Sequence, residues 1–486
     1  MTNSTHPASV VVVGAGQGGH QTAVSLREHG YRGSVTLISA EDALPYERPP
    51  LSKAYLTGEA DQSQLWLRPA TYYVRQSIDL VGGTVTEIDR AARTVRLADG
   101  SSYEYGHLVL ATGARPRALD VQGAGLRGVH TLRTEQDAAE LRAALATARR
   151  AVVVGAGFIG LEFASVARSV VPEPEGATAR GSGGSTARGT GRPTARVPGR
   201  ARCEVTVVEA LDRPLARAVS APTAGHFTRL HREEGTRFLF GRGVAALHGD
   251  GRGRVASVEL ADGRRLPADL VLVGVGVTPR TELAAAAGLA VNGGITVDSR
   301  LLTGDPRISA IGDCAAFPQV RSGNLLRLES VQNAVGHARL AAERITGSTT
   351  RAYDELPWFW SDQFSTRLQI TGVTDGGGHD TEVVLGDVNS GAFSVLLFRG
   401  ADLLAVESVN RPADHLAARQ LLGRAIKVTP DYATAPGFTL RGHLAHPTPG
   451  RPRHTPGADR TVMPCRSSSA DVTPSPDTSP PANDPS

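Results

Sequence analysis

Two aliphatic runs in the chain are surrounded by the same pattern of apolar and small residues. In the first, "VVVVGAGQGG" (10–19) leads into a stretch of helical apolar spacing that ends at Gly30, and "SVTLISAE" (34–41) follows. In the second, "AVVVGAGFIGLEFA" (151–164) has the same order of aliphatic run, glycines and helical stretch. We expect two strand–turn–helix–strand units, because such alternation is typical of a parallel sheet with helices on its faces.

The second unit is interrupted between its helix and its next strand, "CEVTVVEA" (203–210). The intervening residues 172–202 are rich in Gly, Ser, Thr, Pro and Arg and have no apolar periodicity. Such a composition buries too little apolar surface to offset the entropy of ordering. We therefore predict a disordered insertion at 172–202 and, for the same reason, a disordered Pro/Ser/Thr-rich tail at 441–486.

Nearer the end of the chain, the pattern changes to closely spaced strands. Residues 382–409 contain short apolar segments separated by Gly and Asn, which predicts antiparallel strands. Residues 412–426 have the apolar spacing of a helix. Together they predict a separate α+β unit.

The glycines of both turns have the spacing G-x-G-x-x-G. In such a turn the first glycine permits a tight bend, the second admits a pyrophosphate, and the third lets helix and strand pack closely. The phosphates then lie at a helix N-terminus, whose free N–H groups attract negative charge. We interpret both turns as dinucleotide sites, with ordinary glycine turns as the alternative. The glycines are Gly14, Gly16, Gly18 and Gly19 in the first turn and Gly155, Gly157 and Gly160 in the second.

In such sites an acidic residue about 20 positions after the first glycine holds the adenosine ribose. Glu41 follows Gly14 by 27 positions. Glu209 follows Gly155 by 54 positions, which becomes 23 when the 31 residues of the predicted insertion are set aside. A carboxylate there accepts hydrogen bonds from a free 2′-hydroxyl and repels a 2′-phosphate, so the sequence favours NADH over NADPH. Arg213 is close enough in sequence to weaken that preference.

Two dinucleotide sites in one chain suit an enzyme that retains FAD in one site and exchanges NAD(H) in the other. Hydride then passes from the nicotinamide to the flavin. The predicted fold class is α/β, with two Rossmann-like domains and a C-terminal α+β domain. We place the FAD-binding domain at 8–115 and 279–330, the NAD(H)-binding domain at 116–278 and the C-terminal domain at 331–440.

Composition narrows the class of protein further. Of the 486 residues, 40% are hydrophobic and 21% are charged, and no apolar run approaches the ~20 residues of a membrane span. No signal peptide precedes the first strand, so we expect a cytoplasmic protein. Cys203, Cys314 and Cys465 form no C-x-x-C pair, which disfavours disulfide frameworks, bound iron–sulfur clusters and metal sites. The net charge of +4 comes mostly from arginines, which reflects either a compositional bias or a basic face for an acidic partner.

Several segments, in a fixed order, resemble one known family. They resemble the NADH-dependent ferredoxin reductases that serve Rieske dioxygenases and haem monooxygenases, the putidaredoxin reductase family, whose fold is glutathione-reductase-like. The resemblance covers residues 8–425 apart from the predicted insertion. Ala40 is a departure, because many relatives have an aspartate there, which puts one ribose contact in doubt. The segments are "LPYERPPLSKAYLTG" (44–58), "LVLATGARPR" (108–117), "LVLVGVGVTPRTELA" (270–284), "ISAIGDCA" (308–315), "LESVQNAVGHAR" (328–339) and "PWFWSDQF" (357–364).

The resemblance also implies roles for individual residues. It implies that Asp313 binds the ribityl chain of FAD, with a turn or N-cap aspartate as the alternative. It implies that the Lys53 ammonium stabilises the anionic reduced flavin, with a surface lysine as the alternative. Glu162 would orient the nicotinamide carboxamide, with a helix-surface carboxylate as the alternative. The further residues implied to contact a cofactor are Arg48, Val85, Ala111, Thr112, Gly113, Arg133, Gly276 and Val331.

The same resemblance implies an electron path and a partner. Trp358 and Trp360 resemble the aromatic element that covers the flavin, and we choose Trp360 as the catalytic residue, with core packing as the alternative. We hypothesise that electrons pass singly from FAD to a [2Fe–2S] ferredoxin that feeds a Rieske-type or haem oxygenase. A reductase for rubredoxin or a quinone would differ only in its acceptor.

Other activities of related proteins are disfavoured by single features. Disulfide reductases need a redox cysteine pair, and a peroxide-reducing NADH oxidase needs a cysteine near residue 45, where "ALPYERPPLS" has none. The rival from another class is an apoptosis-inducing-factor-like protein that acts through binding partners or DNA. The nicotinamide-pocket residues favour catalysis, so we expect neither nucleic acid nor a membrane as the partner.

Overall fold

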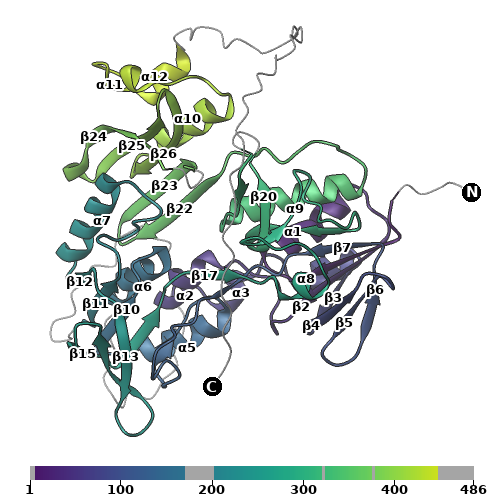
Figure 1. The fold of residues 1–486 in the computed structure, drawn as a ribbon, viewed down its shortest axis with the longest axis horizontal. Helices are drawn as coiled ribbons and strands as arrows, with labels where there is room; N and C mark the ends of the chain where they lie inside the picture. Colours follow the sequence, from purple (N-terminus) through teal and green to yellow (C-terminus); the bar gives the residue numbers. More distant parts are fainter. Residues whose placement is uncertain (1–5, 170–201, 320–322, 375–377, 447–486) are drawn as a thin grey trace, which may run out of the picture. The chain divides into compact units, whose positions relative to one another are not determined.

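The computed structural model describes residues 6–169, 202–319, 323–374 and 378–446 (Figure 1). Except for Arg202, the insertion predicted at 172–202 lies outside these residues, and so does the predicted tail from residue 447 onwards. Within the described residues, no helix is long and apolar enough to cross a membrane.

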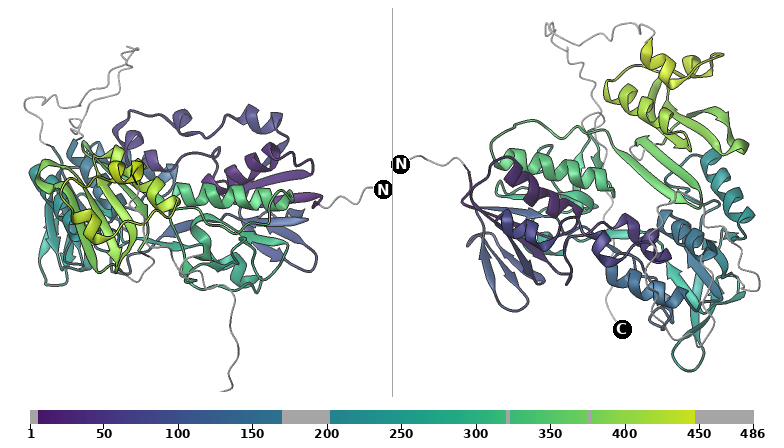
Figure 2. Two further views of the ribbon diagram at one scale, coloured as in Figure 1. Left: turned by 90° about the horizontal axis from the view of Figure 1, so that it is seen from above. Right: turned by 180° about the vertical axis from the view of Figure 1, so that it is seen from behind.

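The first parallel sheet has strands that are nearly continuous aliphatic runs, as expected where both faces are covered. Val10, Val12 and Leu108 are fully buried in it. Helix α1 (Gln17–Glu28) packs against α9 (Val331–Ile345), which comes from far along the chain (Figure 2). Across the sheet, the order is β19 (Ile308–Ala310), β7 (His107–Leu110), β1 (Ser9–Val13), β2 (Ser34–Ser39) and β3 (Ile78–Gly82).

Short elements surround this sheet and carry much of the candidate site. The antiparallel meander consists of β4 (Val85–Asp89), β5 (Thr94–Leu97) and β6 (Ser102–Glu104). Between β2 and β3 the chain forms η1 (Pro49–Ser52), α2 (Ala54–Thr57), α3 (Gln62–Leu65) and α4 (Ala70–Arg75). Before α9 it forms α8 (Glu282–Ala286), β18 (Ile295–Thr296), η2 (Gly312–Cys314), β20 (Ala315–Pro318) and β21 (Leu325–Leu326).

The second parallel sheet repeats the topology of the first. In both sheets the strand that precedes the glycine turn lies between the next strand of its unit and a strand from later in the chain. The order is β12 (Arg237–Phe240), β11 (Glu204–Glu209), β10 (Arg150–Val154), β16 (Leu270–Val273) and β9 (Val129–His130). A meander of β13 (Val244–Gly249), β14 (Val255–Leu260) and β15 (Arg265–Pro267) adjoins it. The helices of this unit are α5 (Glu135–Leu145), α6 (Phe158–Ser169) and α7 (Ala221–Glu233).

The chain crosses between these units twice. It leaves the first sheet after β7 and returns after β16, and the two connections pair as the antiparallel strands β8 (Ala114–Pro116) and β17 (Val277–Pro279). Strand β19 then joins the edge of the first sheet beside β7. The domain boundaries expected near residues 115 and 279 fall in this crossing, and their limits stay a prediction.

The C-terminal sheet is antiparallel, and α10 (Pro412–Gly423) packs on it (Figure 1). Leu396, Phe398 and Val406 of the sheet and Leu421 of α10 are fully buried together. The strands at 382–409 are present as predicted from the sequence, and β22 and β23 are additional strands that were not predicted. The order is β22 (Trp358–Gln363), β23 (Thr366–Gly372), β26 (Asp402–Val409), β25 (Ala392–Arg399) and β24 (Thr381–Asp387), with η3 (Val388–Ser390) between β24 and β25.

The predicted start of a disordered tail at residue 441 is wrong. After α11 (Pro430–Thr434), a further helix, α12 (Leu440–Ala445), packs against α10. The Thr439 hydroxyl caps it by accepting a hydrogen bond from the N–H of Gly442 at 3.0 Å. Leu440 is fully buried in the same cluster as α10. Only a few apolar residues are needed to dock so short a helix, and the polar composition of the segment concealed them.

Candidate active site

The first glycine turn follows β1. Gly14 has a φ of +107°, and a Cβ atom there would lie 2.3 Å from the carbonyl oxygen of Ala111. A Cβ atom on Gly19 would lie 1.8 Å from the carbonyl oxygen of Gly14. Around Gly16, in contrast, no described atom lies within 4 Å of that position. The first and third glycines therefore let the chain pack on itself, whereas the second leaves the open space that a bound pyrophosphate requires.

The second glycine turn, between β10 and α6, has the same division of roles. Gly155 has a φ of +99°, and its Cβ atom would lie 2.5 Å from the carbonyl oxygen of Gly274. A Cβ atom on Gly160 would lie 2.3 Å from the carbonyl oxygen of Gly155. The nearest described atom to the same position on Gly157 is 3.9 Å away. Both turns therefore leave room for a dinucleotide at their second glycine, where the pyrophosphate must approach the backbone.

Both predicted carboxylates lie at the end of the second strand of their unit: Glu41 follows β2 by two residues, and Glu209 is the last residue of β11. Glu41 pairs with Arg48 at 2.5 Å and accepts a hydrogen bond from the Tyr46 hydroxyl. Glu209 accepts hydrogen bonds from the N–H groups of Ala156 at 2.7 Å and Leu211 at 2.9 Å. Each carboxylate oxygen of Glu209 therefore retains an acceptor position, which suits a ribose hydroxyl.

A cavity of about 480 Å³ opens at the first glycine turn, a size in the usual range for a small-molecule site. It extends to α6 of the second unit and to β22 of the C-terminal sheet. It therefore brings together parts of the chain that are far apart in sequence. The predicted site residues that line it are Gly14, Gly16, Gly18, Glu41, Arg48, Lys53, Val85, Ala111, Thr112, Gly113, Arg133, Glu162, Asp313, Val331 and Trp360.

Some of the predicted residues lie outside this cavity. Gly19 lies against Gly14 inside the first turn, and in the second turn Gly155 lies against Gly274 and Gly160 against Gly155. The second unit reaches the cavity instead through Arg133 and Thr134 before α5 and through Phe158, Ile159 and Glu162 at the start of α6. The predicted residues that do not line the cavity are Gly19, Gly155, Gly157, Gly160, Glu209 and Gly276.

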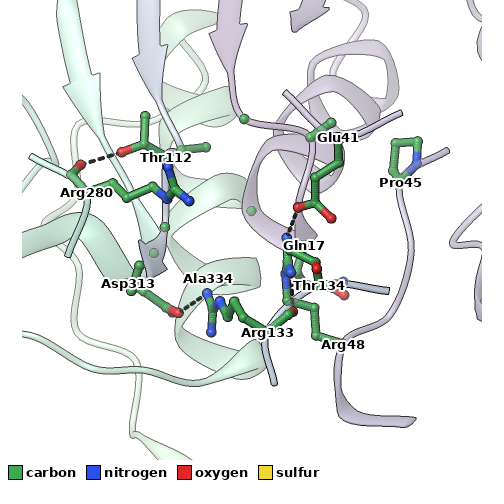
Figure 3. A pocket seen from close by; sticks show the side chains of 18 of the residues that line it. Gln17, Glu41, Pro45, Arg48, Thr112, Arg133, Thr134, Arg280, Asp313 and Ala334 are labelled. Atoms are coloured by element: carbon green, nitrogen blue, oxygen red, sulfur yellow. Dashed lines mark hydrogen bonds and ion pairs between the residues drawn. The ribbon is translucent and has the colours of Figure 1, made fainter. Parts of the chain in front are cut away.

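Opposite charges meet on the wall of the cavity. Arg133 forms an ion pair with Asp313 at 2.9 Å, and the Thr112 hydroxyl donates to the carbonyl oxygen of Arg280 at 2.7 Å (Figure 3). The backbone of Arg133 is fixed because its N–H donates to Asp137, which belongs to the capping box of α5. Arg133 thus lies on the cavity wall paired with Asp313, and its contact with a cofactor stays a prediction.

A second polar cluster is centred on Glu162, whose side chain is almost completely buried. One carboxylate oxygen, Oε2, pairs with the Lys53 ammonium at 2.7 Å and accepts from the Ser52 hydroxyl at 2.5 Å. The other, Oε1, accepts from the Ser361 hydroxyl at 2.7 Å. Lys53 and Glu162 were both predicted, but their pairing was not. Ser52 and Ser361 were missed, since no local spacing marks them.

Aromatic side chains from β22 lie beside the cavity. Trp360 lines the cavity and is partly exposed, which does not fit the alternative of a buried core residue. Its ring centroid is 5.5 Å from that of Trp358. Phe359, on the opposite face of the strand, contacts Phe158 of α6 with centroids 4.5 Å apart. The strand therefore joins the C-terminal sheet to the helix that carries Glu162.

The N-terminus of α9 also opens on the cavity. Ser330 and Val331, at the first turn of this helix, both line it, and the Ser330 hydroxyl accepts from the N–H of Asn333 at 3.1 Å. The remaining free N–H groups of the turn favour negative charge nearby. The contact of Val331 with a cofactor stays a prediction.

The described cysteines are inert. Cys314 is fully buried and burial raises the pKa of its thiol, and burial raises the pKa of the Cys203 thiol to about 12. Both are free. A thiolate is needed for redox chemistry at neutral pH, so neither is poised for it. The described part of the chain also holds no group of three or more His, Cys, Asp or Glu side chains that could bind a metal.

The fold and the site together define an α/β protein with two dinucleotide-binding units that share one cavity. Residues 8–338 match the model of the pyridine nucleotide-disulphide oxidoreductase family, and residues 358–444 match the reductase C-terminal model. The chain belongs to the pyridine nucleotide-disulphide oxidoreductase family. The predicted fold class is confirmed.

Individual relatives are similar over nearly their whole length. Rhodocoxin reductase of Rhodococcus erythropolis is 46% identical over 438 residues, which cover 90% of this chain and 94% of the relative. Putidaredoxin reductase CamA of Pseudomonas putida is 37% identical over 428 residues, which cover 87% of this chain and 93% of the relative. The crystal structure of the ferredoxin reductase for the CYP199A2 system from Rhodopseudomonas palustris is 44% identical, with a TM-score of 0.81 over 90% of this chain and 100% of that chain. The resemblance inferred from the sequence motifs is confirmed.

Proposed function

We propose that this protein is an FAD-dependent reductase that takes hydride from NADH and delivers electrons singly to a [2Fe–2S] ferredoxin, which supplies a Rieske-type or haem oxygenase. The observation that carries the proposal is the shared cavity, which is lined both by the first glycine turn and by the start of α6, next to the second turn. Each NADH is oxidised to NAD⁺, two ferredoxins gain one electron each, and one proton is released. A relative from a Sphingomonas species, 38% identical over 443 residues, is named a ferredoxin–NAD(P)⁺ reductase.

The residues of the chain would hold the two cofactors and set the electrostatics. FAD, when bound, supplies the conversion between two-electron and one-electron transfer. The open space at Gly16 and the N-terminus of α1 would bind its pyrophosphate, and Asp313 would accept a hydrogen bond from a ribityl hydroxyl. The Lys53 ammonium lines the cavity, where it would stabilise negative charge on a reduced flavin ring. Glu162 would accept a hydrogen bond from the nicotinamide carboxamide.

NADH is the proposed reductant rather than NADPH. The Glu209 carboxylate lies beside the second glycine turn, where it would accept hydrogen bonds from a ribose and repel a 2′-phosphate. Arg213 donates to the carbonyl oxygen of Ala216 at 3.3 Å and is engaged within its own turn. We also propose a cytoplasmic location, since NADH is an intracellular reductant.

A second candidate acceptor is rubredoxin. A rubredoxin–NAD⁺ reductase of Pseudomonas putida is 37% identical over 422 residues, covering 99% of that protein. A quinone acceptor and the apoptosis-inducing-factor-like hypothesis have no comparable support among the relatives described above.

The test is NADH-driven reduction of cytochrome c with no carrier, with a [2Fe–2S] ferredoxin and with a rubredoxin. Strong stimulation by ferredoxin is the expected result. Stronger stimulation by rubredoxin favours the second candidate. If NADH bleaches the flavin but neither carrier is reduced across several homologues of each, the proposed function is wrong and the rival based on partner binding gains support.

A further inference from the structure

A chain of buried polar side chains leads from Glu162 away from the cavity. Ser361 donates to Glu162 Oε1 at 2.7 Å, and its hydroxyl oxygen lies 3.2 Å from Gln363 Nε2. Gln363 Oε1 in turn lies 2.9 Å from His231 Nε2, in helix α7. Ser361, Gln363 and His231 are all fully buried. Buried polar groups of this kind are costly unless they are satisfied, so their arrangement is tightly constrained.

The direction of every hydrogen bond in this series of buried side chains follows from the Glu162 carboxylate. Glu162 pairs with the Lys53 ammonium and can only accept, so the single Ser361 hydroxyl proton must point to it. Ser361 must then accept from the Gln363 amide nitrogen, which turns the Gln363 carbonyl oxygen to His231. His231 therefore donates through Nε2. Burial lowers the pKa of His231 to about 4, so at neutral pH the ring is neutral and carries one N–H.

The two carboxylate oxygens of Glu162 accept different numbers of hydrogen bonds. Its Oε2 atom already has two donors, Ser52 and Lys53, which fill both lone-pair positions. Its Oε1 atom has Ser361 as its one donor among the described residues. One acceptor position therefore remains on Glu162, and the direction of the Ser361 hydrogen bond determines where that position points.

The geometry points to Ser361 as a positioning residue for hydride transfer. Held by Gln363 and His231, its hydroxyl orients the free acceptor position of Glu162 toward the nicotinamide carboxamide. This inference rests on the proposed function. It also connects the C-terminal sheet to the nicotinamide site, since β22 supplies Ser361 on one face and Trp360, which lines the cavity, on the other.

The test compares two ligands that differ at the nicotinamide end. FAD-bound wild type and Ser361→Ala are titrated by calorimetry with NAD⁺ and with ADP-ribose, which lacks the nicotinamide. We expect Ser361→Ala to weaken NAD⁺ binding about tenfold, the scale of a hydrogen bond to a charged group, and to leave ADP-ribose binding unchanged. Flavin reduction by NADH, followed in a stopped-flow instrument, should slow by a similar factor.

Ser394→Ala is the matched control. Ser394 is also a fully buried serine of the C-terminal sheet that donates to a carboxylate, Asp414, at 2.9 Å. It does not line the cavity. Its removal should affect thermal stability but neither ligand. In a Glu162→Gln background, Ser361→Ala should have no further effect on NAD⁺ binding, since the two residues act as one unit.

Three outcomes overturn the inference: unchanged NAD⁺ binding in Ser361→Ala, equal weakening of NAD⁺ and ADP-ribose, or additive effects with Glu162→Gln. If Ser361→Ala does not fold, Ser361→Cys fills similar space with a weaker donor and is put through the same comparison, with an intermediate effect expected. Failure of the proposed function looks different, because wild type itself would then either not be bleached by NADH or be bleached and reduce neither carrier.

Discussion

Arg133 and Asp313 are 180 residues apart in the sequence, yet they form an ion pair of 2.9 Å on the wall of the cavity. Arg133 comes from the segment that begins the second unit, and Asp313 follows β19 of the first sheet. Both side chains are partly exposed to the cavity. The pair therefore joins the two units at the place where the phosphates and ribityl chain of FAD are expected.

Asp313→Asn should weaken FAD retention. The amide cannot replace the charge that Arg133 faces, and it presents one acceptor oxygen instead of two, so we expect the FAD dissociation constant to rise about tenfold or more. The measurement is the FAD content of the purified protein and its affinity for added FAD. Asp305→Asn is the control, since it breaks an ion pair with Arg90 outside the cavity. Equal FAD affinity in wild type and Asp313→Asn would contradict the assigned role.

Gly157→Ala and Gly155→Ala should affect different properties, the first the binding of NADH and the second the stability of the fold. At Gly157 a methyl group fits the folded chain but enters the space expected for a pyrophosphate, so the KM for NADH should rise while the melting temperature stays near that of wild type. At Gly155 the methyl group collides with Gly274 and φ is +99°, so the protein should lose about 1–3 kcal/mol of stability. Thermal melts and NADH kinetics check both. A normal KM in Gly157→Ala would mean that the second turn does not bind the nucleotide.

Trp360→Leu should separate the two halves of the reaction. Trp360 lines the cavity but is not among the groups that contact Glu162, so we expect NADH to reduce the flavin at the normal rate and ferredoxin reduction to slow. Stopped-flow measurements of each half-reaction distinguish the two steps. Trp66→Leu, at a tryptophan outside the cavity, should change neither. If flavin reduction slows and ferredoxin reduction does not, the electron path is assigned incorrectly.

Stability should fall steeply as the pH drops from 6.5 toward 4. Burial lowers the pKa of His20, His231 and His415 to about 4 and that of His107 and His337 to about 3, each from 6.5. Below pH 6.5 these histidines bind protons in the unfolded chain but stay neutral in the folded protein. This contribution to stability is therefore present above pH 6.5 and is lost as the pH falls toward the pKa values of the folded protein. A shift from 6.5 to about 4 corresponds to about 3 kcal/mol.

Urea unfolding at a series of pH values measures this dependence. A free energy of unfolding that stays constant between pH 7 and pH 5 would show that these rings are not buried in the neutral form. The folded protein should also keep its flavin above pH 6.5 and lose it together with the cooperative unfolding transition at lower pH.

The sequence was sufficient for features that depend on neighbours along the chain. The aliphatic strands before Gly14 and Gly155, the helices that follow them and the carboxylates Glu41 and Glu209 are all local patterns with a fixed physical reason. The strands at 382–409 alternate clearly enough to be recognised. When the predicted insertion is set aside, Glu209 follows Gly155 at the expected spacing. The parallel pairing of β10 with β11, the strand that ends at Glu209, supports this correction.

Other features depend on contacts between distant residues and could not be predicted. Ser361 lies 199 residues from Glu162 in the sequence, and nothing near Ser361 indicates a carboxylate partner. Strand β22 was missed because its bulky aromatic residues suggested a cofactor cover rather than a strand. Helix α12 was missed because its docking depends on Leu440 meeting α10, in a segment whose composition is otherwise polar.

We propose above all that one chain keeps a flavin and a nicotinamide nucleotide in contact. Anaerobic titration of the purified protein with NADH tests this most directly, with absorbance near the visible flavin band as the readout. We expect a yellow protein that equimolar NADH bleaches and that NADPH bleaches far less. A folded protein that neither contains nor takes up flavin, or a bound flavin that NADH leaves oxidised, would contradict it.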